Sequence, residues 1–404
     1  MNILVFCSNP VDGGTAKVFY ELVCYLKKKE GKRDRIFACV NKNNPVEIYG
    51  KIDFLDRLDV YSEQEVFKNL YGGILPIKIV KKIMRMFQYS PIKKQNINKM
   101  KNYIIENKID CIFIHNGGYV GDDLCNQILE AAYACAKQTV CRVYVLHNDF
   151  KKNIFTKLRF KSYDKKISKE ATELVTVSNF TKNRILSNSY ITRKMTVIYN
   201  GLPESSSLSS EEKKGKIHLD TSKYNILMLG NFQENKGQLQ FIEAAKLMKQ
   251  KNECIEFTFI GNVYDRTYYK QCIENIKKYK LENCTKILHG INNAAEYMDM
   301  FDVIAVPSMY DESFGLISVE AMSKAVPVVA FACGGIPEVL IDGTDGYIVP
   351  VGDSTCMAGK ILELLNNEKL KNQMGQNGRA DYIKRFSVDA MGAQYFALVG
   401  KYRR

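Results

Sequence analysis

Two glutamates, Glu312 and Glu320, stand eight residues apart in a polar stretch that follows an apolar run at Val303–Val306. If the stretch between them were wholly helical, it would measure roughly 12 Å. A pair of carboxylates that cleaves a glycosidic bond stands about 5–9.5 Å apart, so the spacing disfavours that chemistry. It suits two carboxylates that bind hydroxyl groups at opposite ends of one extended ligand. A capped helix with two surface glutamates remains the alternative for this segment alone.

The residues between the two glutamates are suited to an anion. The apolar run ends at Pro307, and the pattern predicts a helix that starts near Ser313–Phe314. Backbone amides in the first turn of a helix have no acceptor within it, and the helix dipole favours negative charge there. We therefore expect the amides around Phe314, Gly315 and Leu316 to bind an anion, with Gly315 allowing close approach of the backbone.

The apolar runs of the chain predict two Rossmann-like, doubly wound α/β domains with a ligand cleft between them. The runs are continuous and alternate with amphipathic helical patterns such as Gly237–Lys251, as expected when helices cover both faces of a parallel sheet. The expected strands are Ile3–Cys7, Ile36–Val40, Cys111–Ile114, Cys141–Leu146, Leu174–Val177, Thr196–Tyr199, Asn225–Leu229, Ile255–Ile260, Lys286–Leu288, Val303–Val306 and Val326–Ala330.

A polar segment marks the boundary between the domains. Residues 204–216 are rich in Ser, Glu and Lys and carry almost no apolar side chains. A chain of 404 residues also exceeds the size of one comfortable core. We predict an N-terminal domain over 1–200 and a C-terminal domain over 201–386. A last helix over about 387–404 is expected to pack back on the N-terminal domain.

Composition excludes several classes of protein. No run of 18 or more apolar residues is present, and the N-terminus is typical of a buried strand rather than of a signal peptide, so we expect a cytoplasmic protein. The 12 cysteines include no Cys-x-x-Cys pair. Several of them (Cys7, Cys39, Cys111 and Cys254) lie in apolar runs, which favours buried, reduced thiols.

Metal ligands are not evident in the sequence. The four histidines lack the spacing of a metal site, and the chain contains no Asp-x-Asp. We therefore expect neither a metal ion nor any other cofactor.

Positive charge gathers in the first half of the chain. Residues 1–200 carry 34 Lys and Arg against 19 Asp and Glu, a net +15, whereas residues 201–404 carry 24 against 25, a net −1. The excess concentrates in 76–101 and 151–169, which predicts contact with an anionic surface or acceptor. Residues 76–88 favour either a packed helix with a basic rim or an interfacial helix on anionic lipid at the inner membrane face. Nucleic acid is disfavoured, because no aromatic residues interleave with the basic ones.

Further segments resemble a known family. A Glu-x7-Glu pair such as Glu312 and Glu320 is typical of the retaining family 4 glycosyltransferases, which have the GT-B fold of two facing Rossmann-like domains. The resemblance covers most of the chain, and its other segments are Asp12–Thr15, Val197–Gly201, Leu229–Gly237, Gly334–Glu338 and Asp342–Pro350.

The resemblance implies roles for individual residues. Glu312 would contact the hydroxyl groups of the donor sugar, Glu320 the ribose, and Lys236 the diphosphate. His147 would lie near the sugar and the attacking hydroxyl, and His115 would line the acceptor side. Backbone near Gly290 and Ile291 would read the nucleobase. The residues expected to bind the nucleotide sugar are Gly13, Gly14, Asn231, Lys236, Ile291, Ser308, Phe314, Gly315, Leu316 and Glu320.

One position departs from the family. Where the family usually has Arg after the glycine of the phosphate loop, this chain has Asn231. An Arg–diphosphate contact is charge-assisted and often bidentate, so its loss should weaken stabilisation of the leaving group unless another cation substitutes.

The function implied is retaining, metal-independent transfer of a sugar from a nucleotide sugar. UDP is favoured as the nucleotide, and the acceptor is expected to be a hydroxyl of a saccharide or lipid-linked saccharide in cell-surface polysaccharide assembly. A catalytically inactive, sugar-nucleotide-binding partner of a glycosyltransferase complex is the alternative. A sugar-nucleotide epimerase shares the two-domain fold but lacks this Glu-x7-Glu context.

Overall fold

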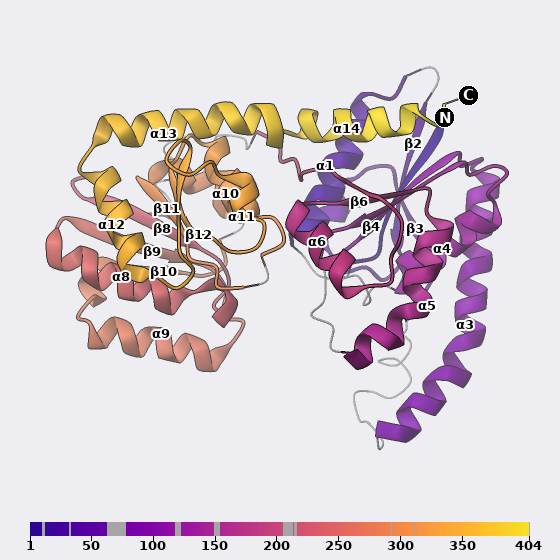
Figure 1. Cartoon of the computed structure of the whole chain (residues 1–404), viewed down its shortest axis with the longest axis horizontal. Helices are drawn as coiled ribbons and strands as arrows, with labels where there is room; N and C mark the ends of the chain where they lie inside the picture. The colour runs from indigo at the N-terminus through magenta and orange to yellow at the C-terminus, as the bar shows by residue number, and fades with distance from the viewer. Residues whose placement is uncertain are drawn as a thin grey trace. The chain divides into compact units, whose positions relative to one another are not determined.

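The computed structural model describes most of the chain. The described residues are 1–9, 13–31, 34–62, 78–117, 123–148, 154–204, 213, 216–291, 293–310 and 312–403, and the side chains of 78–89 and 154–159 lie outside this part. The chain divides into two compact units (Figure 1). The first unit is Met1–Gly201 together with Met391–Arg404, and the second is Leu202–Ala390. Each holds a parallel sheet with helices on both faces, which confirms the predicted pair of doubly wound domains.

The described part of the first unit has a seven-stranded parallel sheet in the order β3-β2-β1-β4-β5-β6-β7. Strands β4 and β5 are buried along their whole length, because both are nearly continuous apolar runs. The strand order reverses between β1 and β4, which places a switch point at the carboxyl ends of these two strands. The strands are β1 (Asn2–Cys7), β2 (Arg35–Asn41), β3 (Leu55–Leu58), β4 (Cys111–Asn116), β5 (Cys141–Leu146), β6 (Glu173–Thr176) and β7 (Met195–Val197).

The helices of the first unit include one from the far end of the sequence. Tyr395 of this helix packs edge-on against Phe113 of β4, with ring centroids 5.4 Å apart. Just beyond it, Arg403 forms an ion pair with Asp34 at 2.8 Å. Tyr395, which is 1% exposed, is therefore part of the first unit's core. The helices are α1 (Gly14–Lys28), η1 (Glu47–Lys51), α3 (Lys78–Glu106), α4 (Asp123–Ala134), α5 (Ile154–Glu170), α6 (Asn179–Asn188) and α14 (Val388–Gly400).

The described part of the second unit has a six-stranded parallel sheet in the order β10-β9-β8-β11-β12-β13. Its strand order reverses between β8 and β11, so the carboxyl ends of those strands flank a second switch point. The strands are β8 (Tyr224–Leu229), β9 (Ile255–Ile260), β10 (Thr285–Leu288), β11 (Val303–Val306), β12 (Val328–Phe331) and β13 (Gly346–Val349).

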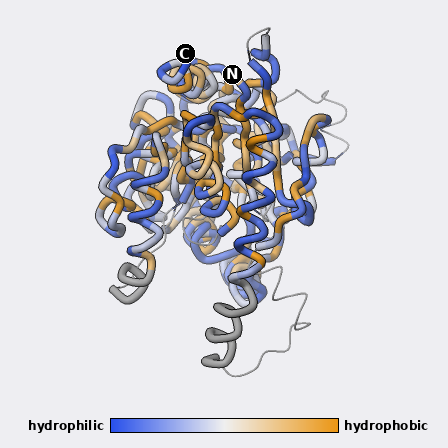
Figure 2. The backbone as a smooth tube through the Cα atoms, turned by 90° about the vertical axis from the view of Figure 1, so that its right-hand side faces the viewer, coloured by the Kyte–Doolittle hydropathy of each residue, from blue (hydrophilic) through white to orange (hydrophobic). Residues whose placement is uncertain are grey.

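The helices of the second unit bury one face each. In α8 the buried residues include Phe241, Ile242, Ala245 and Met248, as the predicted stripe requires, whereas Leu239 is only partly buried. Figure 2 shows both hydrophobic and hydrophilic turns on the outer helices, as expected for helices with one buried face. The helical elements are η2 (Glu234–Lys236), α8 (Gln238–Lys251), α9 (Arg266–Lys278), η3 (Glu282–Cys284), η4 (Ala294–Met300), α10 (Leu316–Ser323), α11 (Ile336–Val339), α12 (Ser354–Leu365), α13 (Glu368–Asp381) and η5 (Tyr382–Phe386).

Three sequence expectations need correction. Strands β3 and β13 were not predicted; β3 is a four-residue edge strand with two charged, exposed side chains, so it lacks an apolar run. The predicted helix start at Ser313–Phe314 is two residues early, because Gly315 takes a left-handed backbone conformation and caps α10. All 12 cysteines are free thiols, but Cys254 is exposed. It lies in a turn before β9, where its N–H donates to Asn252 Oδ1 at 2.8 Å.

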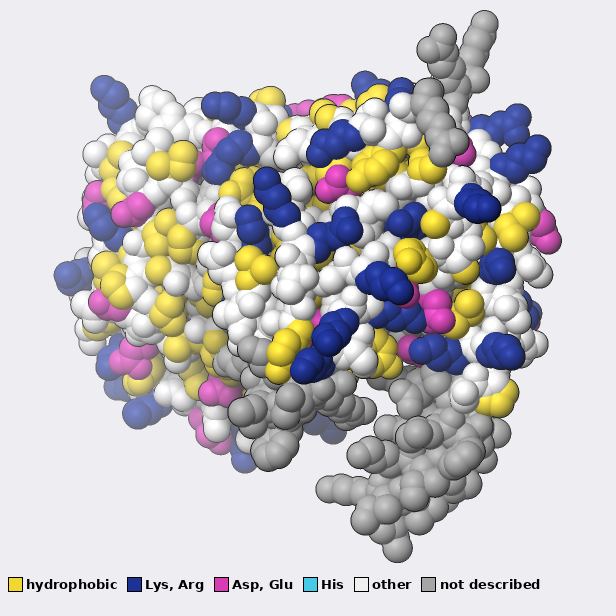
Figure 3. Space-filling view, turned by 45° about the vertical axis from the view of Figure 1, so that its right-hand side comes forward, with side chains coloured by type: hydrophobic (Ala, Val, Ile, Leu, Met, Phe, Trp, Pro, Cys, Tyr) yellow, Lys and Arg dark blue, Asp and Glu magenta, His cyan; other side chains and the backbone are white. Residues whose placement is uncertain are grey.

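The basic stretches 76–101 and 151–169 lie partly outside the described residues. Their described parts belong to α3 and α5. Figure 3 shows Lys and Arg side chains spread over the face drawn, with Asp and Glu among them, rather than gathered in one patch. In the described part of the chain, no helix is long and apolar enough to cross a membrane. Contact with an anionic membrane stays a prediction.

Two helical glycines of the second unit offer a test of this packing. A Cβ atom at Gly375 of α13 would overlap the carbonyl oxygen of Ala325, whereas a Cβ atom at Gly359 of α12 would meet nothing within 4 Å. We expect Gly375→Ala to lower the free energy of unfolding by about 1–3 kcal/mol through overpacking. Gly359→Ala should leave it unchanged or raise it by up to about 1 kcal/mol. Urea unfolding of both variants checks the difference, and equal stabilities would contradict the packing of α13.

Candidate functional site

A hollow of about 300 Å³ lies at the carboxyl edge of the second unit's sheet. It forms there because the loops that follow β8, β9 and β10 leave neighbouring parallel strands at the same edge. Three of the predicted site residues, Asn231, Lys236 and Ile291, line the hollow together. Its lining is completed by Leu229, Gly230, Ile260, Gly261, Asn262 and Gly290.

A charged pair stands beside this hollow. Lys236 Nζ lies 2.9 Å from Glu312 Oε2, and the side chains are 22% and 19% exposed. Ser308 Oγ donates to the same carboxylate oxygen at 3.4 Å. Partial burial strengthens the attraction between these charges relative to water. The structure thus brings together Lys236, Glu312 and Ser308, which the sequence reasoning assigned to one site.

Glycines hold the loop that carries Glu312. Gly334 has φ 59°, and a Cβ atom there would overlap the carbonyl oxygen of Glu312. Gly335 N–H donates to that same oxygen at 2.8 Å. On the other side of the loop, Gly237 has φ 72°, and its Cβ would overlap the carbonyl oxygen of Pro307. Any side chain at these positions would push the Glu312 loop away. The sequence reasoning noted these glycines only as part of a resemblance.

The start of α10, where anion-binding amides are expected, lies two residues later than predicted. Gly315 is the N-cap with φ 103°, so Leu316 is the first helical residue and its amide precedes any acceptor within the helix. Phe314 is 2% exposed and packs against Phe386, so its side chain belongs to the hydrophobic core. Glu320 lies on α10 and is partly buried.

In the first unit, the N-terminus of α1 follows the carboxyl end of β1. Gly13 is the N-cap, and its carbonyl accepts from Lys17 N–H at 3.1 Å. Gly13 and Gly14 are exposed, and no acidic residue lies in the first turn. A helix terminus of this kind favours an anion. Asp12, from the same predicted loop, lies outside the described residues.

Two buried histidines meet at the ends of β4 and β5. His115 Nδ1 lies 3.0 Å from His147 Nε2, and the side chains are 0% and 4% exposed. Burial lowers the pKa of His147 to about 4, and burial with the neighbouring His147 holds the pKa of His115 well below its usual value. The pair is therefore neutral near pH 7. The rings of Phe19 and Tyr395 also pack near His115, and its role on the acceptor side stays a prediction.

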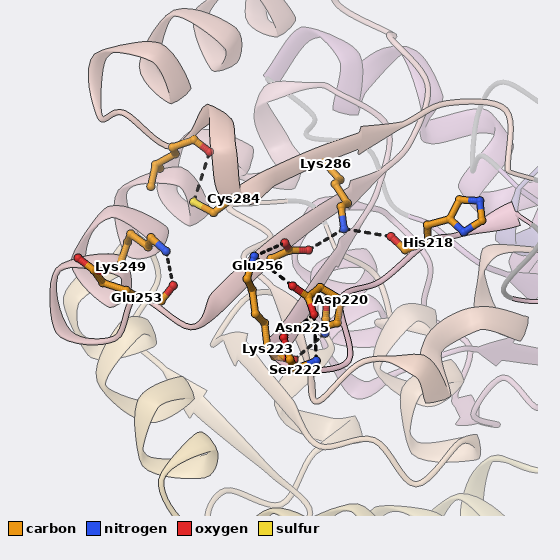
Figure 4. Close-up of polar contacts among 11 residues, drawn as sticks. His218, Asp220, Ser222, Lys223, Asn225, Lys249, Glu253, Glu256, Cys284 and Lys286 are labelled. Atoms are coloured by element: carbon orange, nitrogen blue, oxygen red, sulfur yellow. Dashed lines mark hydrogen bonds and ion pairs between the residues drawn. The ribbon is translucent and has the colours of Figure 1, made fainter.

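A larger hollow, of about 870 Å³, lies at the opposite, amino edge of the second unit's sheet. Figure 4 shows part of its surroundings, where Lys223 and Lys286 flank the buried carboxylate of Glu256. The charged side chains at this edge pair with one another, as in Lys213–Asp299 and Lys371–Asp302. Because ligands of parallel sheets bind beyond the carboxyl ends, we assign the candidate site to the smaller hollow. In the described part of the chain, no group of three or more His, Cys, Asp and Glu is arranged to hold a metal ion.

The histidine pair predicts how stability depends on pH. Because the folded state disfavours the imidazolium of His147, the unfolded chain binds protons more strongly as the pH falls from 6.5 toward 4. We expect this residue to cost about 2 kcal/mol of stability between pH 7 and pH 5. Chemical unfolding of His147→Gln at both pH values should show a smaller loss. His218→Gln, at an exposed position, serves as control, and an unchanged loss in His147→Gln would contradict the prediction.

Comparisons with known proteins point to one family of glycosyltransferases. The family model for glycosyltransferase family 4 matches residues 13–205, and the model for glycosyl transferases group 1 matches residues 209–381. An uncharacterized glycosyltransferase of Methanocaldococcus jannaschii is 27% identical over 292 residues, covering 71% of this chain and 74% of that protein.

Two further proteins are similar to this chain, one in sequence and one in structure. The capsular polysaccharide biosynthesis glycosyltransferase CapM of Staphylococcus aureus is 28% identical over 229 residues, covering 54% of this chain and 58% of its own length. The structure of Anabaena HepE in complex with UDP matches with a TM-score of 0.75 at 17% identity, covering 99% of this chain and 100% of that one. This likeness shows the GT-B fold. Because the two family models together span both units, the chain belongs to the family 4 glycosyltransferases.

Proposed function

We propose that the protein is a retaining glycosyltransferase that takes a sugar from a nucleoside diphosphate sugar, with UDP favoured. One observation carries the proposal: Lys236 lines a hollow of about 300 Å³ and pairs with Glu312 at its side. The ammonium suits a diphosphate, and the carboxylate suits sugar hydroxyls. HepE, which shares the fold, was crystallised with UDP, and this supports the choice of nucleotide.

The leaving group is a diphosphate whose negative charge grows as the bond to the sugar breaks. Lys236 and the first-turn amide of Leu316 are donors of the kind that stabilise such charge, and Gly14 supplies a further amide in the first unit. We propose that these groups act without a metal, since the sequence has no Asp-x-Asp. Glu320 is assigned to the ribose and His147 to the sugar and attacking hydroxyl.

The proposed chemistry is attack by the acceptor hydroxyl on the face from which the nucleotide leaves, through an oxocarbenium-like transition state. The family resemblance supports this stereochemistry. We propose a saccharide or lipid-linked saccharide as acceptor, in cell-surface polysaccharide assembly, because CapM serves capsular polysaccharide biosynthesis. Action at the inner membrane face follows from the basic stretches 76–101 and 151–169. A catalytically inactive sugar-nucleotide-binding partner remains the second candidate.

A panel of nucleotide sugars tests the donor assignment. A donor at about 100 times its Kd stabilises the folded state by about 2.7 kcal/mol. We expect at least one UDP-sugar to raise the melting temperature clearly and to undergo slow hydrolysis. NMR of the released or transferred sugar then reports the anomeric configuration, and inversion would contradict the retaining mechanism. Binding without hydrolysis or transfer would favour the inactive partner.

Substitutions at the charged pair test its role. Lys236→Ala and Glu312→Gln each remove one charge-assisted contact at the candidate site, and we expect either change to lower kcat/KM for the donor by about a hundredfold or more. Glu253→Gln makes the same chemical change at an exposed position and should leave the rate unaltered. Activity of Glu312→Gln close to that of the unaltered protein would contradict the assignment of the carboxylate.

A further inference from the structure

Asn231 stands where the family resemblance expects a cation, and its side chain is engaged in the protein. Its Oδ1 accepts from the backbone N–H of Asn262 at 3.1 Å. Asn262 Oδ1 in turn accepts from the backbone N–H of Gly290 at 3.0 Å. Through two side chains, the loop after β8 is thus connected to the loop after β9, and that loop to the one after β10. We call these three residues the asparagine relay.

The loops joined by the relay are close-packed at their bases. A Cβ atom at Gly261 would overlap the carbonyl oxygen of Gly230, so the loops after β8 and β9 meet through bare backbone. Phe232 N–H donates to Asn262 O at 2.9 Å, and this bond holds the main chain at Asn262, the middle residue of the relay. Gly290 has φ 67°, a conformation that glycine adopts readily, and its N–H donates to Asn262.

The hollow differs chemically between its two sides. Among the described residues that line this hollow, Lys236 supplies the single cationic side chain, whereas Gly290 and Ile291 supply backbone groups and an aliphatic surface. Backbone donors and acceptors beside aliphatic side chains suit a flat nucleobase, while the ammonium suits phosphate. The relay ends on the side suited to the base.

We propose that the asparagine relay positions the backbone at Gly290 for the nucleobase, so that Asn231 governs affinity for the nucleoside part of the donor rather than for its diphosphate. The proposal rests on the proposed function. An Arg at this position has only donors and no acceptor, so it could not receive the Asn262 N–H. At position 231 the chain therefore has a side chain that accepts a hydrogen bond from Asn262, instead of a second cation that could bind phosphate.

Calorimetric titration of the full chain with uridine and with UDP tests the relay, with guanosine, GDP, adenosine and ADP run in parallel. In Asn231→Ala we expect the affinities for uridine and for UDP to fall by the same factor, about fivefold, the usual effect of one neutral hydrogen bond. Asn262→Ala should do the same. Because both substitutions break one relay, the double variant should be about as weak as either single variant.

Two matched variants separate the relay from phosphate contact. Asn231→Asp keeps the acceptor oxygen, so uridine affinity should stay while UDP affinity falls because the new carboxylate repels the diphosphate. Lys236→Ala should likewise weaken UDP and leave uridine unchanged. The isosteric Asp variant also keeps the comparison decisive if an Ala variant folds poorly.

The outcomes separate the role of Asn231 from the proposed function itself. If Asn231→Ala weakens UDP but not uridine, Asn231 is a phosphate contact and the relay is overturned. If neither affinity changes, the relay is overturned as well. If the unaltered protein binds none of the nucleotides, the proposed function itself fails, and that failure is visible without any substitution.

Discussion

Contact between main chains, at distances that only glycine permits, underlies the candidate site. The segment from Pro307 to Glu312 is held on one side by Gly237 and on the other by Gly334. Its position is therefore set by backbone, before any side chain contributes. These backbone contacts place the ion pair between Lys236 and Glu312, because Lys236 directly precedes Gly237 and the carbonyl of Glu312 itself faces Gly334. The ion pair therefore depends on two neighbouring positions, Gly237 and Gly334, that have no side chain.

The same backbone contacts also determine which charges lie side by side in the site. Lys236 and Glu312 form an ion pair in the protein alone, so under the proposed function a diphosphate would compete with this carboxylate for the ammonium. A ligand that offers hydroxyl groups to Glu312 while offering phosphate to Lys236 satisfies both charges at once. A nucleoside diphosphate alone satisfies only one of them. Under the proposed function, this arrangement would favour the intact donor over its product.

Much of the fold could be predicted from the sequence because buried parallel strands are continuous apolar runs. Cys141–Leu146, Ile255–Ile260 and Val303–Val306 were predicted with the bounds that the structure has. Edge strands lack this pattern, as in β3, where the sequence Leu-Asp-Arg-Leu exposes its charges. The start of α10 was misplaced because Gly315 takes a left-handed conformation as N-cap, next to Ile336, which is distant in sequence.

The candidate site, too, could be predicted only in part from the sequence. Spacing indicated Glu312, the family resemblance indicated Lys236 and Ser308, and the structure brings the three side chains together. Their placement by Gly334 and Gly237 could not be predicted, because it requires knowing which carbonyl each glycine faces. Asn262 was missed although it follows a glycine directly after a buried strand, a position where loop residues often bind ligands.

The return of the last helix has a consequence for how the protein is made. Tyr395 packs on Phe113 of the first unit's sheet, and a Cβ atom at Gly392 would overlap the ring of Tyr25, so the helix lies tightly against residues translated early. During synthesis, the second unit emerges whole from the ribosome before the first unit can close its core. The segment that is translated first is therefore among the last to finish folding, and it must wait for some 190 residues of intervening chain. Until then, Phe113 lacks the cover that Tyr395 provides.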